Sequence, residues 1–218
     1  MNRLAQGFLI AVEGLDGVGK TTLCENLIKI LEKEGFSTLK TRQPGGTPIG
    51  SKIREILHKS TERPTYLAEY LLLAADRAQH METVILPALE SGTLVISDRM
   101  GDSSLAYQGY GRGLDKDFIN QVNKKAMQGH VPDLTIYVRL EPSEALKRLE
   151  SRGTAATAIE QESQAFFKRV AHGFETLYAT PAPHLLTLDA RKTPDILAKE
   201  AYLKIIELIN TEKRCGSC

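Results

Sequence analysis

Gly14-Leu15-Asp16-Gly17-Val18-Gly19-Lys20-Thr21 follows the apolar run Phe8-Leu9-Ile10-Ala11-Val12 and precedes a segment of helical period from Leu23 to Glu34. This eight-residue pattern, set between a predicted strand and a predicted helix, indicates a phosphate-binding loop. Glycines in such a loop leave backbone N–H groups open to a polyphosphate, and the helix adds the positive end of its dipole. We expect Lys20 to neutralise charge on the β- and γ-phosphates and Thr21 to ligate Mg²⁺. The stretch therefore predicts a site for a nucleoside triphosphate.

The length and composition of the chain favour a single α/β domain covering residues 1–218. With 42% hydrophobic residues, the chain can bury a large core within one domain. Its 28 basic and 27 acidic side chains nearly cancel, which predicts no bulk attraction to nucleic acid or to a membrane. Residues 1–6 lack the apolar core of a signal peptide, and no segment offers the roughly 18 apolar residues that span a bilayer. We expect a cytoplasmic protein.

The three cysteines do not suggest a metal or redox site. Cys24 lies inside a predicted helix, whereas Cys215 and Cys218 form a C-x-x-C pair in the last four residues. Two thiols cannot fill a zinc site, and a chain terminus is a poor scaffold for redox chemistry. We therefore expect residues 212–218 to form a disordered tail.

Short β-rich runs alternate with longer segments of helical period, which predicts a parallel sheet covered by helices. The expected strands lie near residues 7–13, 37–41, 93–97, 134–140 and 184–188. The predicted architecture is a three-layer P-loop NTPase fold, in which a five-stranded parallel sheet carries helices on both faces. Ligands of such folds bind at the carboxyl ends of the strands, so we expect the site there.

Apolar periodicity predicts helices between these strands. A long helix is expected over residues 66–89, where an apolar stripe indicates ordinary core packing. Another covers about 142–152, and helical character resumes over 159–178. The small residues between the last two predict a mobile flap, or LID, over about 148–161, with an ordinary helix-helix loop as the alternative.

Candidate anion ligands follow two of the other strands. Arg42 ends the second expected strand, just before a turn built on Pro44, Gly45 and Gly46 that could present its guanidinium to a phosphate. A surface turn with a solvated arginine explains that segment equally well. Asp98 follows the third strand and fits the acid that ligates Mg²⁺ beside a phosphate loop.

Two further polar segments are ambiguous by pattern alone. Residues 103–109, Ser-Ser-Leu-Ala-Tyr-Gln-Gly, carry hydroxyls, an amide and a phenol, and such a stretch is typical of any polar loop. Asp76 and Arg77 follow the apolar helical run 71–75. Their spacing favours a solvated ion pair over an arginine that points into a pocket.

Taken together, these segments resemble bacterial thymidylate kinases in order and interval over nearly the whole chain. The phosphate loop is shared by many nucleotide enzymes, whereas Thr-Arg-x-Pro-Gly-Gly-Thr at 41–47, then Asp-Arg at 98–99 and the motif at 103–109, are specific to this family. Asp76-Arg77 and Ile159-Glu160-Gln161-Glu162 add to the likeness. The resemblance implies a homodimer that transfers the γ-phosphoryl group of ATP to dTMP with Mg²⁺, giving dTDP for dTTP biosynthesis.

The resemblance also implies a role for each motif residue. Catalytic roles would fall to Lys20, Arg152, Asp16 and Arg99. ATP would contact Gly14, Leu15, Asp16, Gly17, Val18, Gly19, Lys20, Thr21, Thr22 and Arg148. Asp16 would contact the sugar hydroxyl of dTMP, and Arg42 and Arg99 would bind its phosphate. The base would contact Leu73, Arg77, Ser104 and Gln108. Tyr107 would lie against the 2′ position of the sugar, with Ser103 nearby. Mg²⁺ would be held by Thr21 and Asp98.

The chain departs from the family pattern at four places. Members whose phosphate loop lacks an arginine usually carry catalytic arginines on the flap, yet here Thr157-Ala158 replaces the usual Asp-Arg, so Arg152 is expected to act as the main one. Leu73 replaces a Phe that stacks on thymine, which removes about 0.5 to 1.5 kcal/mol. Gln43 replaces a common Glu and Arg139 the usual Asp, so both remove negative charge near the expected site.

Two other functions remain as alternatives. A switch GTPase is suggested by Asp98-Arg99-Met100-Gly101 and by Asn123-Lys124-Lys125-Ala126, although Ala126 stands where that class has the Asp that binds guanine. Another nucleoside monophosphate kinase, acting on dUMP or UMP, is the second alternative. The methyl group of thymine is worth only about 0.8 kcal/mol if buried, so the sequence does not fix the acceptor.

Overall fold

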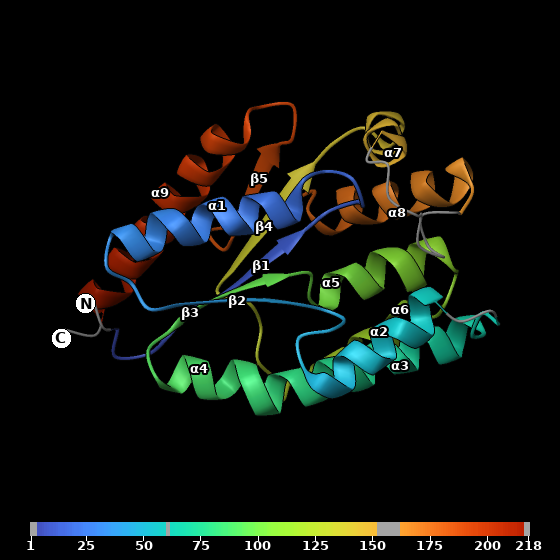
Figure 1. Ribbon diagram of the computed structural model, residues 1–218, viewed down its shortest axis with the longest axis horizontal. Coiled ribbons are helices and arrows are strands. Elements are labelled where there is room, and N and C mark those ends of the chain that lie inside the picture. The colour runs from blue at the N-terminus through green and yellow to red at the C-terminus, as the bar shows by residue number, and fades with distance from the viewer. Residues whose placement is uncertain (1–3, 60–61, 152–161, 216–218) are drawn as a thin grey trace.

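The computed structural model describes residues 4–59, 62–151 and 162–215, and in them a parallel five-stranded sheet lies between layers of helices (Figure 1). The strands are β1 (Leu9–Glu13), β2 (Thr38–Arg42), β3 (Leu94–Asp98), β4 (Leu134–Arg139) and β5 (Leu185–Asp189). Their order across the sheet is β2-β3-β1-β4-β5, so each strand reaches its neighbours through a crossover connection. The predicted fold class is confirmed, and each strand matches its predicted bounds to within two residues.

Helices fill every crossover. The described helices are α1 (Lys20–Lys33), α2 (Pro48–Lys59), α3 (Tyr66–His80), η1 (Met81–Ile85), α4 (Leu86–Glu90), α5 (Gly101–Ser104), η2 (Leu105–Gly111), α6 (Lys116–Ala126), α7 (Pro142–Glu150), α8 (Gln164–Leu177) and α9 (Pro194–Cys215). In Figure 1, α1 and α9 run together over one face of the sheet, and the α3–α4 segment runs below the other. None of the described helices is long and apolar enough to cross a membrane.

The core is divided by the sheet, as the alternation of β1 shows. Ile10 and Val12 point into the larger apolar cluster, which includes buried side chains of α1, α8 and α9. Leu9 and Ala11 point into the smaller cluster, together with Met81 of η1. Because both faces of β1 are buried, its carboxyl end lies in the interior, and the loop that follows is held in place from both sides.

The long helix predicted over 66–89 is present but is not uniform. Its α-helical turns are interrupted by the π-helical segment η1 before α4 begins. The predicted apolar stripe is buried at Tyr70, Ala74, Met81, Ile85 and Leu89, which confirms that it packs into the core.

The helices that flank the predicted flap are α7 and α8. The helix predicted over 142–152 ends at Glu150, and the one predicted to resume at 159 begins at Gln164. Most of the flap falls on residues 152–161, which lie outside the described residues. At the C-terminus, α9 continues to Cys215, and the expected disordered tail over 212–218 stays a prediction.

Candidate active site

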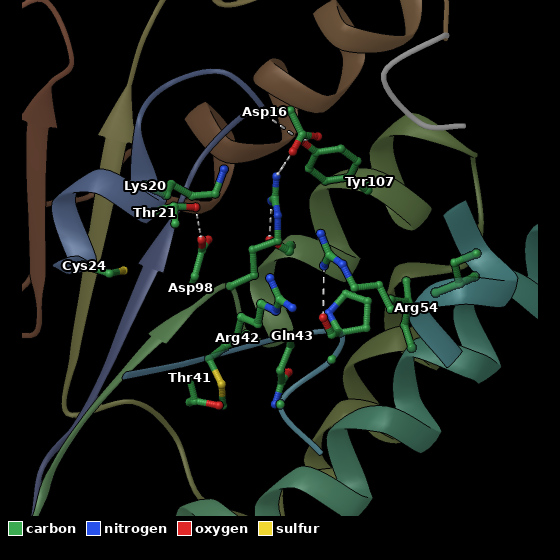
Figure 2. Close-up of a pocket in the computed structure, with 18 of the residues that line it drawn as sticks. Asp16, Lys20, Thr21, Cys24, Thr41, Arg42, Gln43, Arg54, Asp98 and Tyr107 are labelled. Atoms are coloured by element: carbon green, nitrogen blue, oxygen red, sulfur yellow. Dashed lines mark hydrogen bonds and ion pairs between the residues drawn. The ribbon is translucent and has the colours of Figure 1, made fainter. Parts of the chain in front are cut away.

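A cavity of about 680 Å³ lies at the carboxyl ends of β1, β2 and β3, where the sequence predicts the site (Figure 2). The phosphate loop forms one side of it, and the turn after β2 with α2 and α3 forms another. Side chains of η2 and α7 complete the lining. The cavity therefore collects residues that are far apart in sequence.

The phosphate loop needs its glycines for two separate reasons. Gly17 has a positive φ of 84°, and a Cβ there would lie 2.5 Å from the carbonyl oxygen of Ala145 in α7. Gly19 caps α1 with a φ of 96°, and a Cβ there would meet no described atom within 4 Å. The first turn of α1 has no acidic side chain, so its N-terminal N–H groups present an uncompensated positive end to the cavity.

Lys20 is the cation of this loop. Its Nζ donates a hydrogen bond to the carbonyl oxygen of Leu15, 2.7 Å away, and its side chain is largely buried. Burial, and next the positive charge of Arg99, lower the pKa of Lys20 to about 8, against the opposing effect of Asp16 and Asp98. The amine is therefore charged at neutral pH but loses its proton readily as the pH rises.

Thr21 and Asp98 meet beside the loop. The hydroxyl of Thr21 donates to Oδ2 of Asp98 at 2.6 Å, although the two residues are 77 positions apart. Within the described residues no group of three or more His, Cys, Asp or Glu side chains could enclose a metal ion. Mg²⁺ at nucleotide sites usually takes one or two protein oxygens and completes its shell with phosphates and water. A hydroxyl paired with one carboxylate fits that ligand set.

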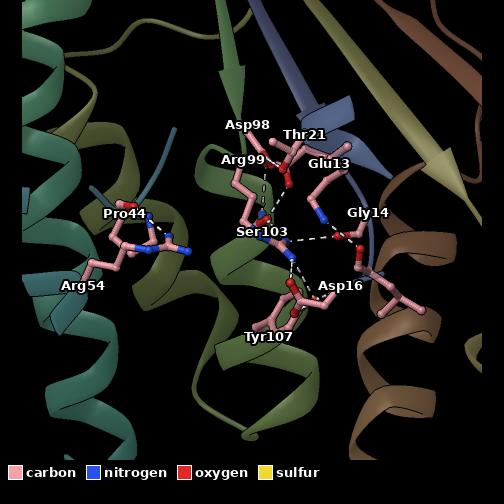
Figure 3. A network of polar contacts seen from close by, with 12 residues as sticks. Glu13, Gly14, Asp16, Thr21, Pro44, Arg54, Asp98, Arg99, Ser103 and Tyr107 are labelled. Carbon is pink, nitrogen blue, oxygen red and sulfur yellow. Dashed lines mark hydrogen bonds and ion pairs between the residues drawn. The ribbon is translucent and has the colours of Figure 1, made fainter. Parts of the chain in front are cut away.

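Arg99 forms the centre of a polar network (Figure 3). Its guanidinium donates to Asp16 Oδ1 at 2.7 Å, to Ser103 Oγ at 2.8 Å, to the Gly14 carbonyl at 3.0 Å and to the Tyr107 hydroxyl at 3.2 Å. The Tyr107 hydroxyl in turn donates to Asp16 Oδ2 at 2.8 Å. Arg99 has a φ of 75°, which is uncommon for a side chain other than glycine. The network holds the arginine in that conformation beside the phosphate loop.

The charges of this network are fixed. Burial by itself would raise the pKa of Asp16, but the positive charges of Arg99 and Lys20 outweigh it and hold that pKa well below its usual range. Burial raises the pKa of Tyr107, so the phenol stays neutral. The site thus contains an ionised carboxylate, a neutral phenol and a permanent cation in contact.

Glu13 is a site residue that our sequence analysis missed. It is fully buried at the end of β1, where its carboxylate accepts hydrogen bonds from the N–H groups of Met100, at 2.7 Å, and Ser103, and from the Ser103 hydroxyl. Burial, and next the negative charge of Asp102, raise its pKa. Met100 follows Arg99 in the chain, and Ser103 accepts a hydrogen bond from it. Because Glu13 holds both residues, it positions that arginine. An acidic residue ending an otherwise apolar strand was the available signal.

Arg77 is not the solvated ion pair that its spacing favours; it lies at the cavity, where the family resemblance places it. The side chain is only 2% exposed and lines the cavity. It donates to Gln43 Oε1 at 3.0 Å, Asn123 Oδ1 at 2.6 Å, Ser104 Oγ at 3.0 Å and the Met100 carbonyl at 3.2 Å. Spacing misled the prediction because four partners from three distant segments, not its own helix, surround this guanidinium.

Asp76, the neighbour of Arg77, is buried as well. Its Oδ1 accepts a hydrogen bond from the N–H of Gly45, 3.0 Å away, and so ties α3 to the turn after β2. Burial raises its pKa, and that hydrogen bond opposes the rise. The two adjacent charged residues thus contact different segments around the cavity: Asp76 binds the turn after β2, and Arg77 binds α5 and α6.

Residues 103–109 are helical, which corrects the expectation of a polar loop. They cover the end of α5 and most of η2, and Ser103, Ser104, Tyr107 and Gln108 all line the cavity. The amide nitrogen of Gln108 donates to Glu69 Oε1 at 2.8 Å, while its Oε1 has no hydrogen-bond partner among the described residues. A buried acceptor is therefore available at the cavity wall.

Two arginines approach the cavity from the side of β2. Arg42 is exposed and lines the cavity, where the sequence analysis places it, and its phosphate-binding role stays a prediction. Arg54 of α2, which sequence analysis did not single out, lies opposite and donates to the Pro44 carbonyl at 3.0 Å (Figure 2). Burial, and next the charge of Arg42, lower the pKa of Arg54. A third, Arg148 of α7, lines the cavity and donates to the Ala190 carbonyl at 3.0 Å.

Comparison with known proteins identifies the family. The model of the thymidylate kinase family matches residues 12–201. The chain belongs to the thymidylate kinase family. The thymidylate kinase of Synechococcus sp. strain CC9605 is 49% identical over 78% of this chain and 84% of its own length. Those of Halothermothrix orenii and Mesoplasma florum are 42% and 40% identical, over 92% and 94% of this chain and 97% and 99% of their own.

Thymidylate kinases are nucleoside monophosphate kinases, so the chain is a phosphotransferase, and the switch GTPase alternative is wrong. The structure agrees with that correction at Asn123, which would begin the guanine-binding motif. Asn123 lies inside α6, where its amide accepts from Arg77 and donates to the Gly101 carbonyl at 3.0 Å. It is a structural partner of the thymidylate kinase cavity.

Other predicted site residues are placed as follows in this thymidylate kinase. Leu73 lines the cavity, and Leu15 and Val18 are buried with their side chains in the core. Arg139 is exposed, pairs with Glu175 at 2.7 Å and is not among the described residues that line the cavity, so its effect on the charge near the site stays a prediction. Arg152 lies outside the described residues.

Proposed function

We propose that this chain transfers the γ-phosphoryl group of ATP to dTMP, giving ADP and dTDP. The observation that carries this proposal is one cavity with two sources of positive charge: the phosphate loop supplies Lys20 and the start of α1, and other segments supply Arg42, Arg54 and Arg99. Two polyanions can approach in line only if fixed positive charge offsets their repulsion.

In the donor half, Lys20 and the N–H groups of the phosphate loop would hold the ATP phosphates, with Thr22 and Arg148 at the sides of the nucleotide. Thr21 and Asp98 would hold Mg²⁺. Bound Mg²⁺ would supply charge neutralisation at the β- and γ-phosphates. The contact between Lys20 and the Leu15 carbonyl keeps the amine directed along its own loop until phosphate oxygens replace that partner.

In the acceptor half, Arg42 and Arg99 would bind the phosphate of dTMP, and Asp16 its sugar hydroxyl. Arg77, Ser104 and Gln108 would contact the thymine, because the unpaired Oε1 of Gln108 matches the N3–H donor of that base. Leu73 would give apolar contact to the ring, and Tyr107 would exclude a 2′-hydroxyl. An ionised Asp16 that is held by Arg99 cannot rotate away, so it fixes the acceptor sugar.

We also propose Arg152 as the catalytic arginine of the flap. The proposal depends on the sequence, because the family usually places such arginines there when the phosphate loop has none. An arginine on the transferring group can contribute on the order of 10³ in rate. An Arg152→Ala variant that keeps nearly full turnover would contradict it.

A homodimer is proposed from the apolar surface of three helices. The exposed large apolar side chains on α2, α3 and α6 are Ile49, Ile56, Tyr66, Leu67, Leu71 and Phe118. Exposed apolar side chains gathered on adjacent helices indicate an interface. Sedimentation of Leu71→Asp beside the unaltered chain tests this, since a dimer should dissociate in the variant. The cytoplasmic location stays a prediction of the sequence.

The activity is tested by ADP release from ATP with dTMP, dUMP, UMP, dCMP and AMP as acceptors. We expect saturable, magnesium-dependent turnover with dTMP and weaker turnover with dUMP, because the two bases differ by one methyl group. Lys20→Ala serves as the control for contaminating kinases. ATP binding without turnover of any pyrimidine deoxynucleotide would overturn the proposal.

A further inference from the structure

His80, the last residue of α3, is fully buried and is not among the described residues that line the cavity. Its ring nitrogens nevertheless contact two residues at the end of β2 and in the turn that follows. Nε2 lies 2.6 Å from Thr41 Oγ1, and Nδ1 lies 3.2 Å from Gln43 Nε2. A chain of contacts therefore runs from Thr41 through His80 and Gln43 to Arg77.

Donor and acceptor chemistry fixes the direction of this chain. Arg77 can only donate, so the amide oxygen of Gln43 must face it, at 3.0 Å from Arg77 Nε. The Gln43 amide nitrogen then faces His80 and must itself donate. His80 Nδ1 consequently has to offer a lone pair, which leaves the ring proton on Nε2, where it is donated to Thr41.

Two further observations support a neutral ring in this orientation. Burial, and next the positive charge of Arg77, lower the pKa of His80 to about 4. A Cβ on Gly46 would lie 2.3 Å from His80 Nε2 and 2.7 Å from Thr41 Oγ1. The turn after β2 therefore packs its backbone directly against the His80–Thr41 contact, and has no room for a side chain at that point.

We propose that His80, as the neutral Nε2–H tautomer, is a positioning residue that aligns Arg77 with the end of β2. Thr41 is the neighbour of Arg42, so the relay sets the distance between the base-side arginine and the phosphate-side arginine. The inference rests on the proposed function for its effect on dTMP. Substitution of His80 should change the binding of dTMP alone, since the described relay makes no contact with the phosphate loop.

The tautomer is tested without any nucleotide. Long-range ¹H–¹⁵N correlation spectra of the full chain at neutral pH report which ring nitrogen carries the proton, and His80→Asn identifies the His80 signals. We expect a pyrrole-type shift at Nε2 and a pyridine-type shift at Nδ1. In Gln43→Glu the carboxylate cannot donate, so the proton should move to Nδ1 or the ring should become charged. The opposite tautomer in the unaltered chain, or no change in Gln43→Glu, would overturn the inference whatever the substrate is.

The functional arm uses two variants that each keep one hydrogen bond. His80→Asn places a carbonyl oxygen near the position of Nδ1 and keeps the bond to Gln43, whereas His80→Gln places an amide nitrogen near Nε2 and keeps the bond to Thr41. We expect the KM for dTMP to rise about tenfold in His80→Gln and clearly less in His80→Asn, as one hydrogen bond is worth about 1.4 kcal/mol. The KM for ATP should stay unchanged in both.

Exposed His184 supplies the matched control, and His184→Asn should behave as the unaltered chain does. Thermal melting of each variant separates loss of folding from loss of alignment. A KM for dTMP that is unchanged in both His80 variants, or parallel changes in the KM for ATP, would overturn the positioning role. If dTMP proved not to be a substrate, the proposed function would fail while the tautomer measurement would still stand.

Discussion

The two halves of the cavity differ in how they acquire their charge. The phosphate loop is one run of residues, 14–21, whose backbone conformation and cation come together along the chain. The acceptor half takes Arg42 from β2, Arg77 from α3, Arg99 from the end of β3 and Tyr107 from η2. The donor half therefore depends on local conformation, whereas the acceptor half depends on packing between segments.

The two halves also hold their cations differently. Within the described part of the chain, Lys20 donates one hydrogen bond, to a carbonyl of its own loop, and can exchange that partner for phosphate oxygens. Arg77 and Arg99 each donate to four partners from elsewhere in the chain. The acceptor arginines are therefore preorganised before a ligand arrives, and changes in their partners should be felt at the site.

The largest loss of activity is expected from a substitution in the donor half. Lys20→Ala should lower kcat by about 10³-fold, because no other side chain of the loop carries positive charge to the phosphates. Steady-state ADP release checks this, with the KM for dTMP measured in the same variant. Retention of more than a tenth of the original kcat would show that the loop backbone alone is sufficient.

Arg99→Ala should lower kcat/KM for dTMP by about 10²- to 10³-fold and leave the Kd for ATP within about twofold. The reason is that Arg99 binds Ser103 and two residues of the phosphate loop, Gly14 through its carbonyl and Asp16 through the carboxylate that is assigned to the sugar of dTMP, but not Lys20 or Thr21. Isothermal calorimetry with each nucleotide separates the two halves. Arg139→Ala, an exposed arginine away from the cavity, is the matched control. Equal losses of affinity for both nucleotides would show that Arg99 serves the ATP side as much as the dTMP side.

Glu13→Gln should lower kcat/KM for dTMP by about 10- to 100-fold, since a buried charge-assisted hydrogen bond is worth about 1.5 to 3 kcal/mol. The glutamine side chain is nearly isosteric, but its amide has only one oxygen. It therefore cannot replace both carboxylate oxygens, one of which accepts from the Met100 N–H and the other from the Ser103 hydroxyl. Circular dichroism and thermal melting control for folding. A variant as active as the unaltered chain would show that Arg99 is positioned without this carboxylate.

The affinity for ATP should fall by about tenfold between pH 7 and pH 9. The pKa of Lys20 is lowered to about 8, so the free amine loses its charge as the pH rises through that value. Titration with a non-hydrolysable ATP analogue across this range tests the effect. Lys20→Arg, which stays charged, should give a flat profile. If the ATP affinity of the unaltered chain did not change with pH, burial would not lower the pKa of Lys20 as assigned.

The smallest effect concerns Leu73, which lines the acceptor half. Leu73→Phe should tighten dTMP binding by about two- to tenfold, corresponding to a stacking contribution of about 0.5 to 1.5 kcal/mol. ATP binding should not change. Calorimetry that finds an unchanged or raised dissociation constant for dTMP would count against the assigned pocket for the base.

Sequence reasoning succeeded where the signal lay in neighbouring residues. The strand, loop and helix around Gly14 to Thr21 and the five strands were predicted because turn residues and apolar periodicity act over short distances. The argument from spacing failed at Arg77, although the family resemblance placed it at the site, because its position on α3 does not reveal the partners that Gln43 and Asn123 provide. Sequence reasoning also missed Glu13, because one acid at the end of a strand looks like any other until its surroundings are known.

The sequence by itself determined the phosphate loop, the parallel α/β architecture and the family, because each follows from residue types at fixed local spacings. Only the tertiary structure decided which arginine is buried, which carboxylate holds it and which proton His80 keeps. Those properties depend on hydrogen-bond partners and burial that come from segments tens of residues apart. The residue type determines which chemistry a side chain can perform, but the groups that the fold packs around it determine its charge state and its orientation.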